Sequence, residues 1–153
     1  MIPNLQPQDD RDSDRLAWAR HALDDGSAVL HRASVDAGHR SYWRSSGHGP
    51  DRIVMDSPPL LEDVRPWLHM RDLLESGDVR VPQVLARDVE AGFLLLEDLG
   101  GPTLAQVLDE TNADAYFDGA MTQLLQLQSI TPPADMGQFG EALLQRDAGL
   151  FEE

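Results

Sequence analysis

The residue types that usually carry out chemistry are few in this sequence. It has no cysteine, and all 12 of its basic residues are arginine, so it has no lysine. Disulfides, thiolate metal sites, cysteine nucleophiles and reactions that require a lysine amine are therefore excluded within the chain. His39 and His69 belong to no group of His, Asp and Glu at the spacing of metal ligands, so we expect no metal site. Asp24 and Asp25 are adjacent, so they do not face each other on a helix as an acid–base pair would.

The stretch 84–102 organises the rest of the chain. Residues 84–86 are apolar and β-prone, and the polar segment 87–92 ends in glycine, which suits a hairpin turn. Residues 93–96 form a continuous apolar run, typical of a strand that is covered on both faces. The polar segment 97–102 ends in Gly-Gly-Pro, a strong stop signal. We therefore expect a buried hairpin that leads into a hinge between a small sheet lobe and a helical lobe.

The segments before this hairpin predict a helix and then a strand meander. Ser13 or Asp14 can cap a helix that ends after Leu23. The acidic leader, residues 1–12, is expected to be a solvated tail. Three short strands joined by tight turns follow and indicate an antiparallel meander, at residues 27–33, 40–44 and 52–56.

The remaining segments have apolar residues at helical spacing. A helix is expected within residues 60–76, and Pro66 favours a start close to it, because proline is tolerated in the first turn. Three further helices are expected beyond residue 102, at residues 103–110, at 111–130 and from 139 to the end.

Length and charge limit the classes of partner. With 153 residues, the chain is long enough for one domain with a sizeable core. Its net charge of −15 argues against non-specific binding to nucleic acid, which depends on Lys and Arg at phosphates. No apolar stretch approaches the roughly 20 residues of a membrane span, and the leader lacks the features of a signal peptide. We therefore expect a cytoplasmic protein with neither nucleic-acid nor membrane partners.

Four stretches resemble elements of bacterial phosphotransferases of the aminoglycoside/choline kinase superfamily. They are residues 40–44 (RSYWR, beside RRYWR), 53–59 (IVMDSPP, beside MDAPP), 79–85 (VRVPQVL, beside VxVPxVL) and 92–100 (GFLLLEDLG in both). Within the superfamily, they are most similar to the anomeric N-acetylmuramate/N-acetylglucosamine kinases of cell-wall sugar recycling.

The resemblance implies an α+β fold. It would be a protein-kinase-like small lobe, with an antiparallel five-stranded sheet and a helix, followed by the first helices of the large lobe. The chain would then divide into an acidic tail, a small lobe, a hinge and the start of a helical large lobe, at residues 1–12, 13–96, 97–102 and 103–153.

The resemblance also implies that ATP lies between the lobes, with its adenine edge bonded to the hinge backbone. By position, the carbonyl of Glu97 would accept from the adenine amino group, and the N–H of Leu99 would donate to a ring nitrogen. Leu96 would line the back of the pocket. Backbone groups suit this task because they are fixed in place and do not titrate.

The phosphates would lie under the turn at residues 34–39, where the backbone at Gly38 and His39 can approach them closely. A plain turn is the alternative role for Gly38. Kinases usually place a strand-three lysine on the phosphates. Because this chain has none, Arg40 and Arg44 are the candidates for the phosphate-binding charge. A solvated strand face is the alternative role for both arginines.

Two departures from the family pattern bear on activity. Met55 or Asp56 stands where the lysine is expected, and no glutamate is placed to pair with such a cation, because Glu62 falls too early. The family's catalytic Asp, its Asn and its metal-binding Asp lie in the large lobe, and no His-x-Asp follows residue 100. We therefore expect the N-terminal part of a longer kinase, inactive by itself, with the Mg²⁺ ligands in the remainder of the large lobe.

The expected function is ATP binding for a small-molecule phosphotransferase that acts on a sugar hydroxyl, with an amino sugar favoured. One alternative is a non-catalytic kinase-like remnant that acts as a binding module. Another is a small α/β domain unrelated to kinases, which parallel strands in an extended sheet would favour. Apolar helix faces left exposed would favour self-association. The residues concerned are Leu124, Leu127, Leu143 and Leu144.

Overall fold

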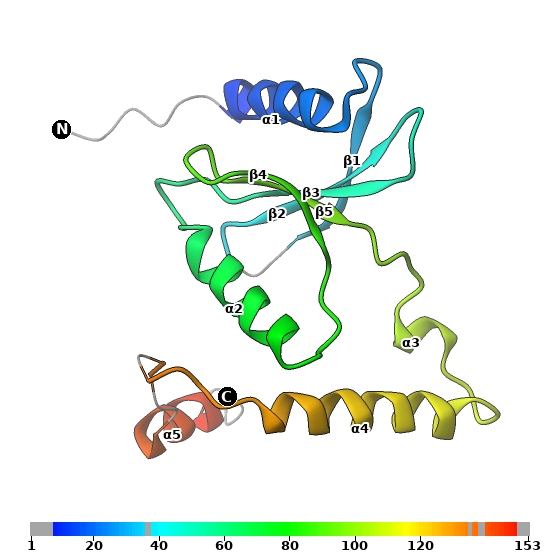
Figure 1. Ribbon diagram of the computed structural model, residues 1–153, viewed down its shortest axis with the longest axis vertical. Coiled ribbons are helices and arrows are strands. Elements are labelled where there is room, and N and C mark those ends of the chain that lie inside the picture. Colours follow the sequence, from blue (N-terminus) through cyan, green and yellow to red (C-terminus); the bar gives the residue numbers. More distant parts are fainter. Residues whose placement is uncertain (1–7, 36–37, 135, 138–139, 150–153) are drawn as a thin grey trace.

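The chain folds around one sheet that has helices on both sides (Figure 1). The computed structural model describes residues 8–35, 38–134, 136–137 and 140–149. Its elements, in chain order, are α1 (Gln8–Leu23), β1 (Val29–Val35), β2 (Ser41–Ser46), β3 (Arg52–Asp56), α2 (Arg65–Ser76), β4 (Val84–Asp88), β5 (Phe93–Glu97), α3 (Leu104–Val107), α4 (Ala113–Ser129) and α5 (Glu141–Gly149).

The five strands form one sheet in the order β1-β2-β3-β5-β4, and every neighbouring pair is antiparallel. The helix α2 separates the meander β1–β3 from the hairpin β4–β5, and the hairpin joins the sheet through β5 beside β3. This confirms the predicted five-stranded antiparallel sheet. The parallel strands that would favour an unrelated α/β domain do not occur in the described part of the chain.

Strand β5 lies between β3 and β4 and is buried from Phe93 to Leu96. The exposed fractions are 2% for Phe93, 0% for Leu94, 4% for Leu95 and 3% for Leu96. Figure 1 shows why: α1 and α2 lie on opposite faces of the sheet. Because both faces are covered, the run is apolar at every position instead of alternating with polar residues. The prediction of a strand covered on both faces is confirmed.

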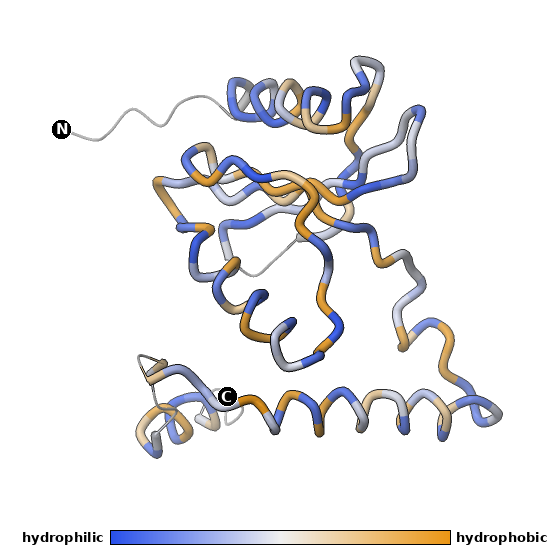
Figure 2. The backbone as a smooth tube through the Cα atoms, viewed as in Figure 1, coloured by the Kyte–Doolittle hydropathy of each residue, from blue (hydrophilic) through white to orange (hydrophobic). Residues whose placement is uncertain are grey.

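The two faces of the sheet carry separate cores, since successive strand residues point to opposite faces. On the α2 face, Leu94 packs in one cluster with Leu68 of α2. On the α1 face, Leu95 and Val54 pack in a second cluster with Ala19 of α1. Figure 2 shows the hydrophobic stretches that run through these central strands.

The first helix begins earlier than predicted. It starts at Gln8, ahead of the expected cap at Ser13 or Asp14, so the prediction of a solvated tail is wrong for the described part of the leader. The reason is a long-range contact: the guanidinium of Arg11 donates two hydrogen bonds to Asp56 of β3, 45 residues away. Such a contact stabilises a first helical turn that has no apolar residue to indicate it.

Two other boundaries concern the turn after β1 and the start of α2. Strand β1 continues to Val35, so the turn predicted at residues 34–39 begins later, and residues 36–37 lie outside the described ranges. Helix α2 begins at Arg65 with Pro66 in its first turn, which confirms the predicted start near this proline.

The segment after β5 passes from the sheet to the later helices (Figure 1). We call residues 97–102, the predicted hinge, the connector. Strand β5 ends at Glu97, and residues 98–102 form neither helix nor strand. The stop predicted from Gly-Gly-Pro is therefore found where it was expected, while hinge motion stays a prediction.

Helix α3 is shorter than predicted. It ends at Val107 because Leu108 is extended, with φ −69° and ψ 129°. The carboxylate of Asp109 then accepts hydrogen bonds from the N–H groups of Thr111 and Asn112 and closes a turn before α4. The side chain of an aspartate thus competes with continued helix, as it often does at helix ends.

Helices α4 and α5 bury none of their described side chains. The exposure predicted for four leucines is confirmed, and self-association through them stays a prediction. Other large apolar side chains of α4 are exposed as well, namely Tyr116, Phe117, Met121 and Leu125. Among the described residues, no helix has the length and apolar character needed to cross a membrane.

Candidate functional site

A cavity of about 320 Å³ lies on the α2 face of the sheet, where β5 passes into the connector. This volume is at the lower end of the range of small-molecule sites. Its lining comes from β1, β2, β3, α2, β5, the connector and the segment before β4: Ala33, Ser34, Tyr42, Arg44, Ile53, Trp67, Pro82, Leu96, Glu97, Asp98, Leu99 and Gly100.

Strand register gives the cavity an apolar wall. Ile53 of β3 is paired with Leu96 of β5, and on its other side with Arg44 of β2. Paired residues on neighbouring strands point to the same face, so these three side chains form one row across the sheet. A row with two aliphatic side chains suits contact with a planar ring. The predicted position of Leu96 in a pocket wall is found.

The connector offers backbone groups at the edge of this cavity. Leu99 is 60% exposed, and its N–H makes no hydrogen bond with any part of the chain that the structure describes. The N–H of Glu97 donates to the carbonyl of Gln83 at 2.9 Å, which holds the end of β5 against the segment before β4. Gly100 has a φ of +80°, a conformation that favours glycine and turns the connector away from the strand. Glu97 and Leu99 thus both line the cavity, and their bonds to adenine stay a prediction.

Two ion pairs hold the connector in place. Arg44 donates to Asp98 through Nε at 2.5 Å and Nη2 at 3.1 Å, and the N–H of Gly100 donates to the same carboxylate at 2.8 Å. Arg80 donates to Glu97 at 3.0 and 2.6 Å. Arg44 therefore lines the cavity, but its guanidinium is already matched by a carboxylate of the connector.

These contacts lower the pKa of both carboxyl groups. For Asp98 the largest cause is the hydrogen bond from Arg44, which outweighs the opposing effect of burial. For Glu97 it is the hydrogen bond from Arg80, followed by the backbone N–H of Gln83. Hydrogen bonds to the ionised form favour that form.

Acidification is expected to weaken the connector. A depressed folded pKa stabilises the fold fully above the ordinary values, 4.5 for Glu97 and 3.8 for Asp98, and this contribution is lost as the pH falls through the folded pKa. Urea-unfolding midpoints measured from neutral pH down to about 3 should therefore fall most steeply below about pH 4. The Asp98→Asn variant should show a shallower fall. Parallel curves for the variant and the wild type would contradict a role for this carboxylate.

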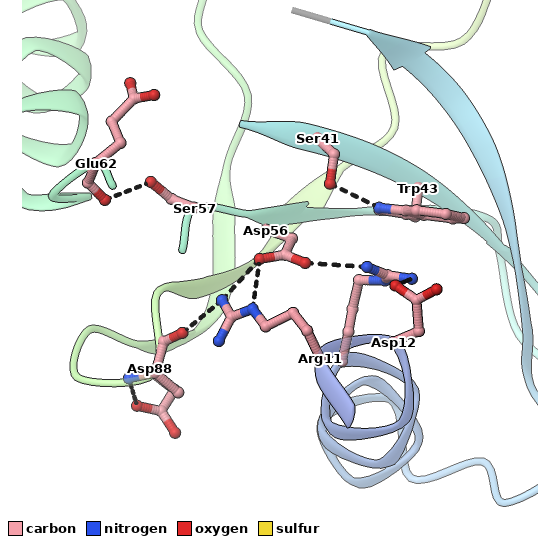
Figure 3. A network of polar contacts seen from close by, with 10 residues as sticks. Arg11, Asp12, Ser41, Trp43, Asp56, Ser57, Glu62 and Asp88 are labelled. Carbon is pink, nitrogen blue, oxygen red and sulfur yellow. Dashed lines mark hydrogen bonds and ion pairs between the residues drawn. The ribbon is translucent and has the colours of Figure 1, made fainter. Parts of the chain in front are cut away.

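Met55 and Asp56 of β3 stand where the strand-three lysine of kinases was expected, and they point to opposite faces of the sheet. Met55 is fully buried in the core on the α2 face, the same face as the cavity. Asp56 points to the α1 face, where its carboxylate accepts from Arg11 at 3.0 and 2.6 Å and from Arg15 at 3.0 Å (Figure 3). Asp56 is therefore not near the cavity. The four-residue spacing of the two arginines, which places them on one helix face, was the available signal for this contact.

The turn before β2 is bound to Glu62, which corrects the expectation that this glutamate falls too early to pair with a cation. The N–H of His39 donates to Glu62 Oε2 at 3.1 Å, and Arg40 Nε lies 3.0 Å from Glu62 Oε1. The segment before α2 folds back, with the N–H of Glu62 bonded to the carbonyl of Pro58 at 2.9 Å. This fold brings Glu62 under the turn. Gly38, His39 and Arg40 lie together at Glu62 and are not among the residues that line the cavity.

The described residues contain no group of three or more His, Asp or Glu side chains that could hold a metal ion. A second cavity, of about 250 Å³, lies on the α1 face between the end of α1 and the β2–β3 turn. Neither the connector nor the turn at Glu62 contributes to it. The candidate site is therefore the cavity on the α2 face.

Comparison with known proteins finds relatives that share one name. No protein-family model matches the sequence. Three relatives are named N-acetylmuramate/N-acetylglucosamine kinase. The protein from Pseudomonas putida is 42% identical over 124 residues, which are 81% of this chain and 37% of the relative. The protein from Pseudomonas aeruginosa is 41% identical over 126 residues, 82% of this chain and 37% of the relative. The protein from Neisseria meningitidis is 30% identical over 141 residues, 89% of this chain and 42% of the relative.

The chain thus spans about two fifths of the length of the relatives it matches. Identity at this level, over most of the chain, makes it a homologue of proteins named as sugar kinases and supports a kinase family.

Proposed function

We propose that this chain binds ATP in the cavity on the α2 face and is the nucleotide-binding part of a phosphotransferase. The acceptor is a sugar hydroxyl, with an amino sugar favoured by the names of the homologues. The observation that carries the proposal is the cavity itself. It combines an aliphatic wall with an unpaired backbone donor on the connector, in a chain homologous to sugar kinases.

The base end of the nucleotide lies at the connector. Ile53 and Leu96 contact the faces of a planar ring, the N–H of Leu99 donates to a ring nitrogen, and the carbonyl of Glu97 accepts from an amino group. The ion pairs of Asp98 and Glu97 fix this stretch of backbone before any ligand arrives. Groups fixed in advance lose less entropy on binding, so they favour affinity.

The phosphate end lies toward the turn that contains Gly38 and His39. With a net charge of −15, the chain as a whole repels a polyanion, so local cations must offset that repulsion. When bound with magnesium, ATP supplies the group that is transferred. Among the described residues, no group of three or more His, Asp or Glu side chains could hold the metal.

Calorimetry with a non-hydrolysable ATP analogue, with and without Mg²⁺, tests the proposal. We expect binding by the wild type and a loss of up to about tenfold in affinity for Leu99→Pro, which removes one backbone donor. Leu99→Ala is the matched control, because it shortens an exposed side chain and keeps the N–H. Equal losses in the two variants would mean that the backbone N–H does not contact the ligand.

A non-catalytic kinase-like binding module is the second candidate. The observation in its favour is the apolar Met55 at the position of the usual strand-three lysine. A wild-type chain that gives no heat with the ATP analogue would support this module and contradict the first proposal.

A further inference from the structure

One carboxylate bridges two consecutive residues of the turn before β2. Glu62 Oε2 accepts from the N–H of His39 at 3.1 Å, and Glu62 Oε1 lies 3.0 Å from Arg40 Nε. The turn also comes close to the same oxygen at Gly38, where a Cβ would be 3.1 Å from Glu62 Oε2. Glu62 thus determines both where the turn backbone lies and where the arginine points.

Glu62 is itself held at the end of β3. The hydroxyl of Ser57 donates to the carbonyl of Glu62 at 2.9 Å (Figure 3). Ser57 is completely buried, and its N–H donates to the carbonyl of Gly92 at 2.9 Å. The backbone that carries the carboxylate is therefore connected to the β3–β5 part of the sheet. A side chain that starts from a fixed backbone is suited to orienting another group.

The strand register places Arg40 at the end of the cavity away from the connector. The row Arg44–Ile53–Leu96 lies at the connector, and Tyr42, which also lines the cavity, lies one row further along β2. Arg40 precedes Tyr42 by two residues. At roughly 3.3 Å per residue, Arg40 is about 13 Å along the strand from Arg44. When the base of a nucleotide lies at the connector and its ribose and phosphates follow these rows, the phosphates lie toward Arg40.

Both arginines that could meet phosphates are paired with a carboxylate, but they lie at different ends of the cavity. Arg44 is bonded to Asp98 of the connector, at the base end, and Arg40 lies against Glu62, away from the connector. No lysine exists in the chain, and Met55 brings no charge. A guanidinium has five N–H donors in a planar fork, a geometry that suits phosphate as well as carboxylate.

We infer that Glu62 is a positioning residue that holds the turn and directs Arg40 to the phosphates. The pair Arg40–Glu62 would then take the place of the strand-three lysine and its glutamate. This inference rests on the proposed function, because it assumes that a nucleotide occupies the cavity. It assigns the cation to the turn before β2 and its partner to the segment before α2, instead of to β3 and the helix.

The sign of one affinity change tests the inference. A carboxylate that merely lies near a triphosphate repels it, so its removal would strengthen binding. A positioning carboxylate gives the opposite result: Glu62→Gln should weaken the binding of an ATP analogue by about tenfold. Adenosine, which has no phosphate, should bind within about twofold of the wild-type affinity. Arg40→Gln should show the same difference between the two ligands.

A double-mutant cycle and two controls complete the experiment. In the Arg40→Gln background, Glu62→Gln should have little further effect on the affinity for the ATP analogue, because the two residues act as a unit. Glu90→Gln, at an exposed glutamate paired with Arg65, should change neither affinity. Glu62→Asp, which keeps the charge but shortens the reach, replaces Glu62→Gln if that variant does not fold, and should show the same selective loss.

The two possible failures are distinguishable. A wild-type chain that binds neither adenosine nor the ATP analogue overturns the proposed function, and with it this inference. A wild-type chain that binds both, together with a Glu62→Gln variant that binds the ATP analogue equally well or more tightly, overturns the inference alone.

Discussion

Replacing Gly92 with alanine is expected to lower the free energy of unfolding by about 3–5 kcal/mol. Gly92 has a φ of +74°, and a Cβ at this position would lie 1.9 Å from the carbonyl oxygen of Ser57. The two backbones cannot simply separate, because the N–H of Ser57 donates to the carbonyl of Gly92 at 2.9 Å. Denaturant unfolding monitored by circular dichroism measures the loss.

Gly100→Ala is the matched control for this substitution. Its φ of +80° imposes a similar backbone strain, but no atom lies within 4 Å of the added Cβ. We expect a loss of about 1–2 kcal/mol, from strain alone. Equal losses at the two glycines would show that the close approach of Ser57 does not contribute.

The Asp56→Asn variant is expected to be destabilised by about 3–5 kcal/mol, the usual cost of breaking a buried ion pair by removing one partner. Asp56 is 2% exposed and Arg15 is 5% exposed. The guanidinium of Arg15 also lies over the ring of Trp43, 3.7 Å from its centre, so it cannot easily turn to solvent. Without the carboxylate, this buried arginine keeps one carboxylate partner, the half-exposed Asp12 at 2.8 Å. Thermal or urea unfolding gives the difference.

Two comparison variants separate this effect from a general sensitivity of the fold to substitution. Asp63→Asn removes a half-exposed carboxylate that pairs with the exposed Arg65, and should cost no more than about 1 kcal/mol. Adding Arg15→Met to Asp56→Asn should restore part of the loss, because it removes the buried charge that has lost its buried partner and keeps an apolar chain of similar length. A double variant less stable than Asp56→Asn alone would contradict the assigned cause.

Local signals were enough to predict the centre of the fold. The buried strand was predicted from the apolar run at residues 93–96, and its end from the Gly-Gly-Pro that follows. Both features depend on residues that are neighbours in the sequence. The start of α1 could not be predicted in this way. Its first turn depends on the bond from Arg11 to Asp56, and nothing in the residues around Arg11 indicates that partner.

In the candidate site, too, the residues close together in sequence could be predicted, and a contact between distant segments could not. Leu96, Glu97 and Leu99 are close together in sequence and line one cavity, while their contact with a nucleotide stays a prediction. The sequence does not predict Glu62 as the partner of Arg40, because Glu62 precedes α2, the helix on which such a partner is expected. The segment before α2 instead folds back on Pro58, and this backbone geometry is set by contacts that become visible only in three dimensions.

Because successive side chains of a strand point to opposite faces of the sheet, the sheet is sensitive to the deletion of a residue within a strand. In β3, Ile53 and Met55 face the cavity side, while Val54 and Asp56 face α1. Point substitutions can therefore alter ligand contacts and fold stability separately. Removing a single residue within this strand would exchange the two sets at once, turning the carboxylate toward the cavity and the aliphatic side chain toward the arginines of α1. Such a change in the strand register would abolish folding and, with it, any binding in the cavity.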